Sequence, residues 1–127
     1  MGVCSVLVID DEPMICDVIQ QALGRADFRV ETAGDAFAGI AKFDEGVFDV
    51  VITDVQMPKG DGYVVVRHIR NSVRSDTPVI GLSGTPWLLK DDCFDRVMEK
   101  PFKINQMVDT VRSLTTRCGA VKREALG

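Results

Sequence analysis

Short apolar runs alternate with helical repeats along the whole of this chain. Runs at 4–9, 48–53 and 78–82 have little polar alternation, as expected for strands buried on both faces. The run at 28–33 alternates with charged residues and predicts an edge strand, and 95–98 predicts a short, weak strand. Helical spacing, or the need for a crossover, predicts helices at 13–24, 35–45, 63–71 and 104–118. In the second of these helices Phe37, Ile40 and Ala41 are expected to face inward, with Phe43 as a further candidate.

The alternation of strands and helices predicts a single α/β domain. A strand followed by a helix is the repeating unit of a parallel sheet that helices cover on both faces. Right-handed crossovers and short connections favour a doubly wound five-stranded parallel sheet with strand order 2-1-3-4-5. The 127 residues suit one such domain. We expect it to span residues 1–118, with 119–127 as a frayed C-terminal tail.

Composition and charge indicate which partners and which cellular location to expect. The net charge of −4 argues against direct binding to nucleic acid or to an anionic membrane surface. No apolar run reaches the length of a membrane span, and no basic region precedes an apolar core at the N-terminus. The four cysteines, at 4, 16, 93 and 118, form no close-spaced pair and are expected to be reduced and packed as small hydrophobes. These features predict a cytoplasmic protein.

Polar residues follow four of the apolar runs, where the expected strands end. Asp10 and Asp11 follow the first run, Asp54 the next buried one, Ser83 the third, and Lys100 follows the weak strand. Taken singly, each has an ordinary explanation, such as a helix cap or a turn. Because the carboxyl ends of parallel strands meet at one edge of a sheet, the set predicts a common site there.

The residue types at this edge suit a cation and a phosphoryl group. Crowded carboxylates repel one another unless a cation is present, and ligands that are all oxygen favour Mg²⁺. Lys100 would supply a positive charge, and the Ser83 hydroxyl could donate to a phosphoryl oxygen. The backbone N–H groups of Gln56 and Gly84 could do the same. Asp54 could then act as a nucleophile that forms an aspartyl phosphate.

The motifs together resemble those of a known family. They are the pair Asp10-Asp11, the stretch 54–62 (Asp-Val-Gln-Met-Pro-Lys-Gly-Asp-Gly), Ser83-Gly84 and Lys100-Pro101-Phe102. This set resembles the response-regulator receiver domain, the phosphoacceptor module of two-component signalling, whose sheet has the flavodoxin-like order. The resemblance implies that the chain is a signalling domain rather than an enzyme.

The resemblance also implies a role for each carboxylate. Asp54 would accept a phosphoryl group from a phosphohistidine on a histidine kinase or a histidine phosphotransfer protein. Asp11 and Asp54 would bind Mg²⁺ together with the backbone carbonyl of Gln56, and Asp10 would assist through a water molecule. The phosphorylated domain would then act on an unidentified downstream protein or pass the group along a phosphorelay.

Other matching residues would bind the phosphoryl group. Ser83, Lys100 and the backbone of Gly84 would hold its oxygens, and the Lys100–Pro101 peptide bond would be cis. Two features depart from the family pattern. Val97 occupies the switch position, three residues before the lysine, where an aromatic residue is usual. The segment between Ser83 and Lys100 is also short by roughly one helical turn, so only a shortened fourth helix fits.

Two other functions and a longer parent protein stay open at this point. The chain could be a decayed receiver that binds its partner without phosphorylation, an alternative that Val97 keeps open. It could also be a small phosphohydrolase with an Asp nucleophile, although such enzymes commonly carry Asp-x-Asp after the first strand. Finally, it could be excised from a hybrid kinase or a longer transcription factor.

Trp87 and His68 are interpreted as structural residues rather than as functional ones. Trp87, the single tryptophan, is expected to be a partly buried anchor for the short helix, with a role in partner contact as the alternative. His68 lies among arginines on the expected third helix and is interpreted as a solvated surface residue without an acidic partner.

Overall fold

The computed structural model describes residues 3–58, 60–89 and 93–115, and it shows one parallel sheet between two helix layers. The sheet order is β2-β1-β3-β4-β5, as the sequence predicts. The strands are β1 (Ser5–Ile9), β2 (Arg29–Ala33), β3 (Val50–Asp54), β4 (Val79–Ser83) and β5 (Arg96–Glu99). The helices are α1 (Pro13–Arg25), α2 (Ala36–Glu45), α3 (Gly62–Arg70) and α4 (Ile104–Leu114), with a 3₁₀ turn, η1 (Pro86–Leu88), between β4 and β5. The expected tail at 119–127 lies outside the described residues.

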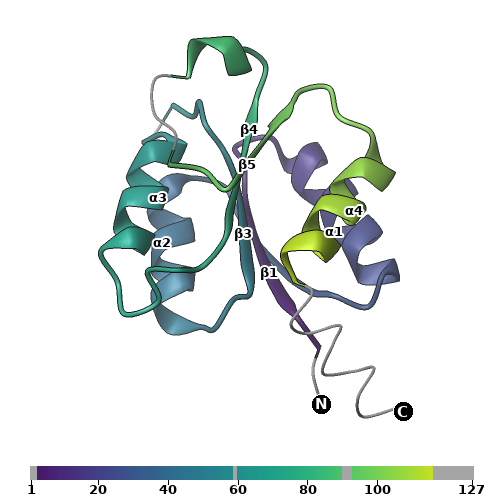
Figure 1. The fold of residues 1–127 in the computed structure, drawn as a ribbon, viewed down its shortest axis with the longest axis horizontal. Coiled ribbons are helices and arrows are strands. Elements are labelled where there is room, and N and C mark those ends of the chain that lie inside the picture. Colours follow the sequence, from purple (N-terminus) through teal and green to yellow (C-terminus); the bar gives the residue numbers. More distant parts are fainter. Residues whose placement is uncertain (1–2, 59, 90–92, 116–127) are drawn as a thin grey trace.

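Helices cover both faces of the sheet, as in a doubly wound fold. Figure 1 shows α2 and α3 on one face and α1 and α4 on the other. Every residue of β3 and β4 is buried, because both faces of these central strands lie under helices. Ile9 pairs with Thr53, Asp54 with Leu82, and Ser83 with Glu99 across neighbouring strands. This register brings the carboxyl ends of β1, β3, β4 and β5 to one edge.

The buried face of α2 differs from the one that the sequence predicts. Ala36, Gly39 and Phe43 are buried, whereas Phe37 is 64% exposed and Ala41 is also exposed. A Cβ atom at Gly39 would lie 2.3 Å from Ile9 Cδ1, so the missing side chain lets the helix approach the sheet closely. The expected inward positions of Phe37 and Ala41 were therefore wrong, because the close approach at Gly39 turns their side of α2 away from the sheet.

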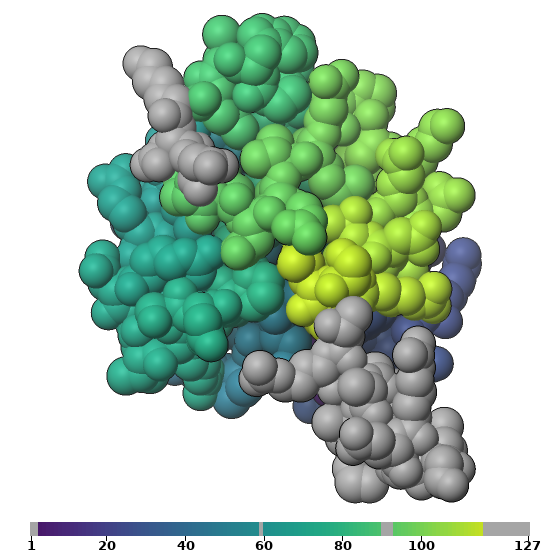
Figure 2. Space-filling view, viewed as in Figure 1, coloured from purple at the N-terminus to yellow at the C-terminus, as the bar shows by residue number. Residues whose placement is uncertain are grey.

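The connection between β4 and β5 holds a single turn of helix within its described part. The 3₁₀ turn η1 is therefore the shortened fourth helix, and Figure 2 shows this region projecting at the top of the molecule. Trp87 on η1 is 71% exposed, so the interpretation of Trp87 as a partly buried anchor was wrong. Phe94 is buried instead, where it packs in the space left by Gly81, and its ring lies 5.4 Å from that of Tyr63.

Side chains at the start of β5 hold this edge strand in place. Asp95 Oδ2 accepts hydrogen bonds from the backbone N–H of Val79 and from Arg70 Nη2, both at 2.7 Å. Arg70 also donates to the carbonyls of Ser75 and Thr77. The same guanidinium thus joins the end of α3 to the residue that precedes β5.

His68 and the cysteines also correct the sequence analysis. His68 Nε2 lies 2.7 Å from Asp44 Oδ1, so this histidine has an acidic partner on α2. Cys4 is disulfide-bonded, so the expectation that all four cysteines are reduced was wrong for Cys4, and the predicted cytoplasmic location loses that support. Cys16 is a free thiol, and burial together with the nearby Asp10 charge raises its pKa above 9.0.

A helix needs about 20 predominantly apolar residues to cross a bilayer. No helix in the described part of the chain is long and apolar enough to do so.

Candidate functional site

The polar residues at the strand ends meet as the sequence predicts. The Lys100 ammonium lies 3.2 Å from Asp10 Oδ2 and 3.1 Å from Asp54 Oδ2. The backbone N–H of Lys100 donates to the Ser83 carbonyl at 2.8 Å, which continues the β4–β5 pairing beyond the last strand residue. Residues that are up to 90 positions apart in sequence therefore form one cluster, from Asp10 to Lys100.

Asp54 is the last residue of β3 and is only 6% exposed. Its Oδ1 accepts from the backbone N–H of Gln56 at 3.3 Å, and its Oδ2 faces the Lys100 ammonium. The carboxylate is thus held from both sides in a nearly dry position. Such a group is well placed to act as a nucleophile, because its oxygen atoms are oriented before any partner arrives.

Asp10 directly follows β1 and is 1% exposed. Its Oδ1 accepts from the backbone N–H of Glu12 at 2.9 Å. Its Oδ2 is buried and has no hydrogen-bond partner among the described residues, although the Lys100 ammonium lies 3.2 Å away as an ion pair. A buried carboxylate oxygen that lacks a hydrogen bond is a position where a cation or a water molecule would be stabilised.

Glu12 is a site residue that the sequence analysis missed. Its Oε1 lies 3.4 Å from Lys100 Nζ. Its carboxylate joins those of Asp10 and Asp54 in a group in which one oxygen of each residue lies within 4.8 Å of the other two. Asp11 is exposed and is not part of that group, so its role as a ligand stays a prediction. The three consecutive acidic residues at 10–12 indicated that Glu12 could belong to the site. The sequence alone does not show which of these three side chains turn inward.

Ser83 and its neighbours form the other wall of the site. Ser83 is 1% exposed, and its Oγ accepts from the backbone N–H of Thr85 at 3.0 Å. Gly84 lies between them and is exposed, and a Cβ atom there would meet nothing within 4 Å. Thr85 Oγ1 is buried without a hydrogen-bond partner among the described residues. The Lys100–Pro101 peptide bond beside this wall is cis.

Burial sets the protonation behaviour of the cluster. Loss of solvation raises the pKa of both Asp10 and Asp54 above the usual 3.8, and contact with Lys100 offsets only part of this effect. The neighbouring charges of Asp54 and Asp11 raise the two values further. For Lys100 burial lowers the pKa, but the contacts with Asp54 and Asp10 outweigh burial and raise it above 10.5. The site therefore holds more negative charge than one ammonium can neutralise.

The residues present fit a hard divalent cation. The donors are carboxylate oxygens, with no histidine or cysteine in the group. The buried Asp10 Oδ2 lacks a hydrogen bond, and burial, together with the neighbouring carboxylates, raises the pKa of Asp10 and of Asp54. A cation would relieve both conditions. Mg²⁺ matches this donor set, because it binds one or two carboxylates and keeps several waters.

Metal-free protein is expected to gain stability from Asp10 and Asp54 as the pH falls through their raised pKa values toward 3.8. A carboxyl with a raised pKa binds more protons in the folded state than in the unfolded state, so its contribution to stability falls as pH rises from 3.8 through the raised value. Denaturant titrations across this range should show a steeper pH dependence for wild type than for Asp10→Asn. Parallel curves for the two proteins would contradict the expectation.

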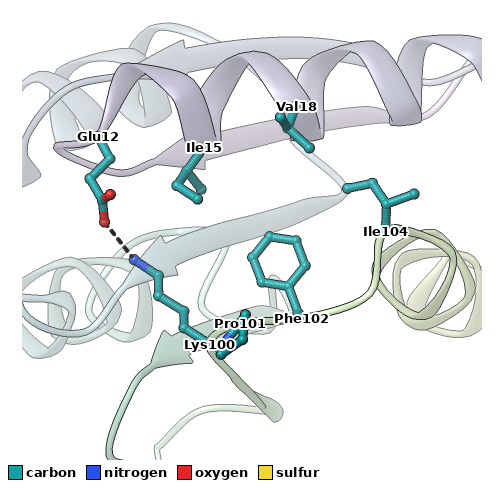
Figure 3. A pocket seen from close by; sticks show the side chains of 7 residues that line it. All are labelled: Glu12, Ile15, Val18, Lys100, Pro101, Phe102 and Ile104. Carbon is teal, nitrogen blue, oxygen red and sulfur yellow. Dashed lines mark hydrogen bonds and ion pairs between the residues drawn. The ribbon is translucent and has the colours of Figure 1, made fainter.

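An open groove of about 430 Å³ runs outward from the Glu12–Lys100 pair. Figure 3 shows Ile15 and Val18 on α1 facing Phe102 and Ile104 across it, with the charged pair at one end. The groove is thus apolar along its walls and charged where it reaches the acidic cluster.

A family model and curated relatives match this chain along most of its length. Residues 6–112 match the model described as the response regulator receiver domain. The transcriptional regulatory protein TrcR of Mycobacterium tuberculosis is 33% identical, over 94% of this chain and 48% of TrcR. The DNA-binding dual master transcriptional regulator RpaA of Synechocystis is 30% identical, over 94% of this chain and 52% of RpaA. The chain spans about half the length of the curated relatives it matches.

Solved structures of similar size share the fold. The chemotaxis response regulator CheY4 of Vibrio cholerae is 27% identical with a TM-score of 0.82, over 88% of this chain and 98% of CheY4. The response regulator TrrA of Thermotoga maritima, solved in complex with Mg²⁺ and BeF, is 28% identical with a TM-score of 0.79, over 88% of this chain and 99% of TrrA. With the family match over residues 6–112, the chain belongs to the response-regulator receiver domains, the phosphoacceptor domains of two-component signalling.

Proposed function

We propose that Asp54 accepts a phosphoryl group from the phosphohistidine of a histidine kinase or a histidine phosphotransfer protein. The observation that carries this proposal is the position of Asp54, which is buried at the end of β3 with a lysine ammonium 3.1 Å from its carboxylate and further carboxylates beside it. The phosphorylated domain signals by contact with a downstream protein or by phosphorelay. It turns over no substrate apart from its own phosphoryl group.

The reaction transfers one phosphoryl group between two side chains. An oxygen of the Asp54 carboxylate attacks phosphorus, the P–N bond to the donor imidazole breaks, and the imidazole leaves with the electron pair of that bond. Lys100, the Ser83 hydroxyl and the backbone N–H of Gly84 are proposed to stabilise the negative charge on the phosphoryl oxygens. The Lys100 ammonium already faces Asp54, so its side chain needs to move little to reach a phosphoryl group on that carboxylate.

Mg²⁺ is the proposed cofactor, and when bound it neutralises charge between the carboxylates and the phosphoryl oxygens. Asp54, Asp11 and the backbone carbonyl of Gln56 are proposed as ligands, with Asp10 assisting through water. The buried Asp10 Oδ2 without a hydrogen bond and the grouping of carboxylates support a cation at this place. The similar regulator TrrA was solved in complex with Mg²⁺ and BeF, which supports Mg²⁺ as the cofactor.

The surface that reports phosphorylation is proposed to be a protein-binding one. Val97 lies on β5 and is 42% exposed, so the switch position carries a small apolar side chain in place of an aromatic ring. Trp87 and Leu88 on η1 are also exposed. The net charge of −4 supports a protein partner over direct contact with nucleic acid, whatever a longer parent chain would bind.

Loss of the acceptor tests the proposal. Incubation with Mg²⁺ and acetyl phosphate is expected to add a single alkali-labile phosphoryl group to wild type, measured as intact mass, and none to Asp54→Asn. Asp76→Asn is a matched control, since Asp76 is an exposed aspartate outside the site, and it should be phosphorylated like wild type. Either an adduct that persists in Asp54→Asn or a wild type that takes no phosphoryl group, even from phosphorylated kinases, would contradict the proposal.

A further inference from the structure

Glu12 is placed at the start of α1, but its side chain does not serve the helix. It is the N-cap residue, with φ −97° and ψ 108°, and its carboxylate accepts no capping hydrogen bond. Its backbone carbonyl accepts from the N–H groups of Ile15 and Cys16, so the backbone alone starts the helix. The carboxylate instead reaches across the groove to the Lys100 ammonium, as Figure 3 shows.

The three carboxylates around Lys100 differ in their solvation. The side chain of Asp10 is fully buried and that of Asp54 is 8% exposed, whereas that of Glu12 is 61% exposed. Contacts with the two inner aspartates are strengthened by burial, and the contact with Glu12 is screened by water. Glu12 therefore adds negative charge at the mouth of the site at a low cost in desolvation.

Charge at this position acts in opposite directions on two ligands. A divalent cation held at the acidic cluster gains from a further carboxylate close by. A phosphodonor such as acetyl phosphate is an anion, and it must pass the same carboxylate to reach Asp54. The Glu12 carboxylate also competes with the phosphoryl oxygens for the Lys100 ammonium, since all would bind the same group.

We propose that Glu12 is a positioning residue that strengthens cation binding at the acidic cluster and slows entry of the phosphodonor by placing a negative charge beside Lys100 at the mouth of the site. The part of this inference that concerns the phosphodonor rests on the proposed function. The part that concerns cation binding is independent of it, because it is measured as the affinity of the unphosphorylated protein for Mg²⁺. Asp10 Oδ2 is buried, makes no hydrogen bond and faces the Lys100 ammonium, 3.2 Å away, which it shares with Asp54 and Glu12; this observation favours a further cation inside the cluster.

The test measures affinity and rate separately in Glu12→Gln, which keeps the shape of the side chain and removes its charge. Titration with Mg²⁺ alone, followed by the amide resonances of Asp54 and Gln56, should give a Kd about three- to ten-fold higher than in wild type. At Mg²⁺ concentrations that saturate both proteins, the rate constant for phosphorylation by acetyl phosphate should be a few-fold higher than that of wild type.

Two controls separate this role from a structural one. Asp17→Asn removes one charge from the exposed side of the same helix and should change both quantities by less than about two-fold. Glu12→Asp keeps the charge with a shorter reach and should keep the Mg²⁺ affinity within about three-fold of wild type. Denaturant unfolding of each variant checks that it is folded.

Failure of the role of Glu12 and failure of the proposed function would give different results. An unchanged Mg²⁺ affinity in Glu12→Gln, or a phosphorylation rate at saturating Mg²⁺ that is no higher than that of wild type, would overturn the role of Glu12. A wild type that binds Mg²⁺ but takes no phosphoryl group would instead overturn the proposed function and leave the effect of Glu12 on Mg²⁺ binding standing.

Discussion

Replacement of Lys100 by methionine is expected to lower the free energy of unfolding of the metal-free protein by roughly 3 kcal/mol at neutral pH. Lys100 is the cation that contacts Asp10 and Asp54, at 3.2 and 3.1 Å, and these carboxylates are almost completely buried. Its removal leaves two buried negative charges without compensation, and such a change costs far more than loss of a surface ion pair. Phosphorylation by acetyl phosphate should fall to the background level, because the charge that faces Asp54 is gone.

The stability effect of Lys100→Met should shrink as the pH falls, because both aspartates then accept protons and need no partner. Lys103→Met is the matched control, since it removes the charge of an exposed lysine on the same connection. Its free energy of unfolding should stay close to that of wild type. Equal stability of Lys100→Met and wild type at neutral pH, in the absence of Mg²⁺, would show that the cluster does not depend on this ammonium.

Gly62→Ala is expected to destabilise the fold by roughly 2–3 kcal/mol and to reduce phosphorylation sharply. A Cβ atom at Gly62 would lie 2.8 Å from the Asp54 carbonyl oxygen and 3.0 Å from Val55 Cα. Both are backbone atoms that cannot rotate away, and the Gly62 N–H also donates to the Val55 carbonyl at 2.9 Å. The start of α3 must therefore move, or the end of β3 that carries Asp54 must. A displacement of about 1 Å at a reacting group can cost on the order of 100-fold in rate.

Gly24→Ala provides the control for this substitution. Gly24 lies in α1, where a Cβ atom would meet nothing within 4 Å, so alanine should stabilise the helix by roughly 0.5–1 kcal/mol. The pair is measured by denaturant unfolding and by phosphorylation rate. If Gly62→Ala were as stable and as active as wild type, then the contact between α3 and the end of β3 would not be as tight as the geometry indicates.

The sequence was sufficient to predict the sheet and the main part of the site, for a physical reason. Parallel strands bring their carboxyl ends to one edge, so Asp10, Asp54, Ser83 and Lys100 could be placed together without coordinates. Apolar runs buried on both faces are a strong signal, and all five strands appear within one or two residues of their expected ends. The strand order followed from the handedness of the crossovers.

Features that depend on the direction of individual side chains could not be predicted from the sequence. Hydrophobicity predicted Phe37 on the inner face of α2, but the close contact of Gly39 with Ile9 turns the helix the other way. Adjacent carboxylates look alike in sequence, so Glu12 could not be separated from Asp11. The partner of His68 lies 24 residues away on another helix, and no local pattern reports such a pair.

The backbone hydrogen bond from Lys100 to the Ser83 carbonyl ties together the two side chains that are proposed to hold the phosphoryl group. The ends of β4 and β5 are therefore joined directly beyond their last strand pair. A partner that pulls on β5 from outside would shift the serine as well as the lysine. With only valine at position 97, the strand itself rather than a rotating ring is left to carry the displacement outward.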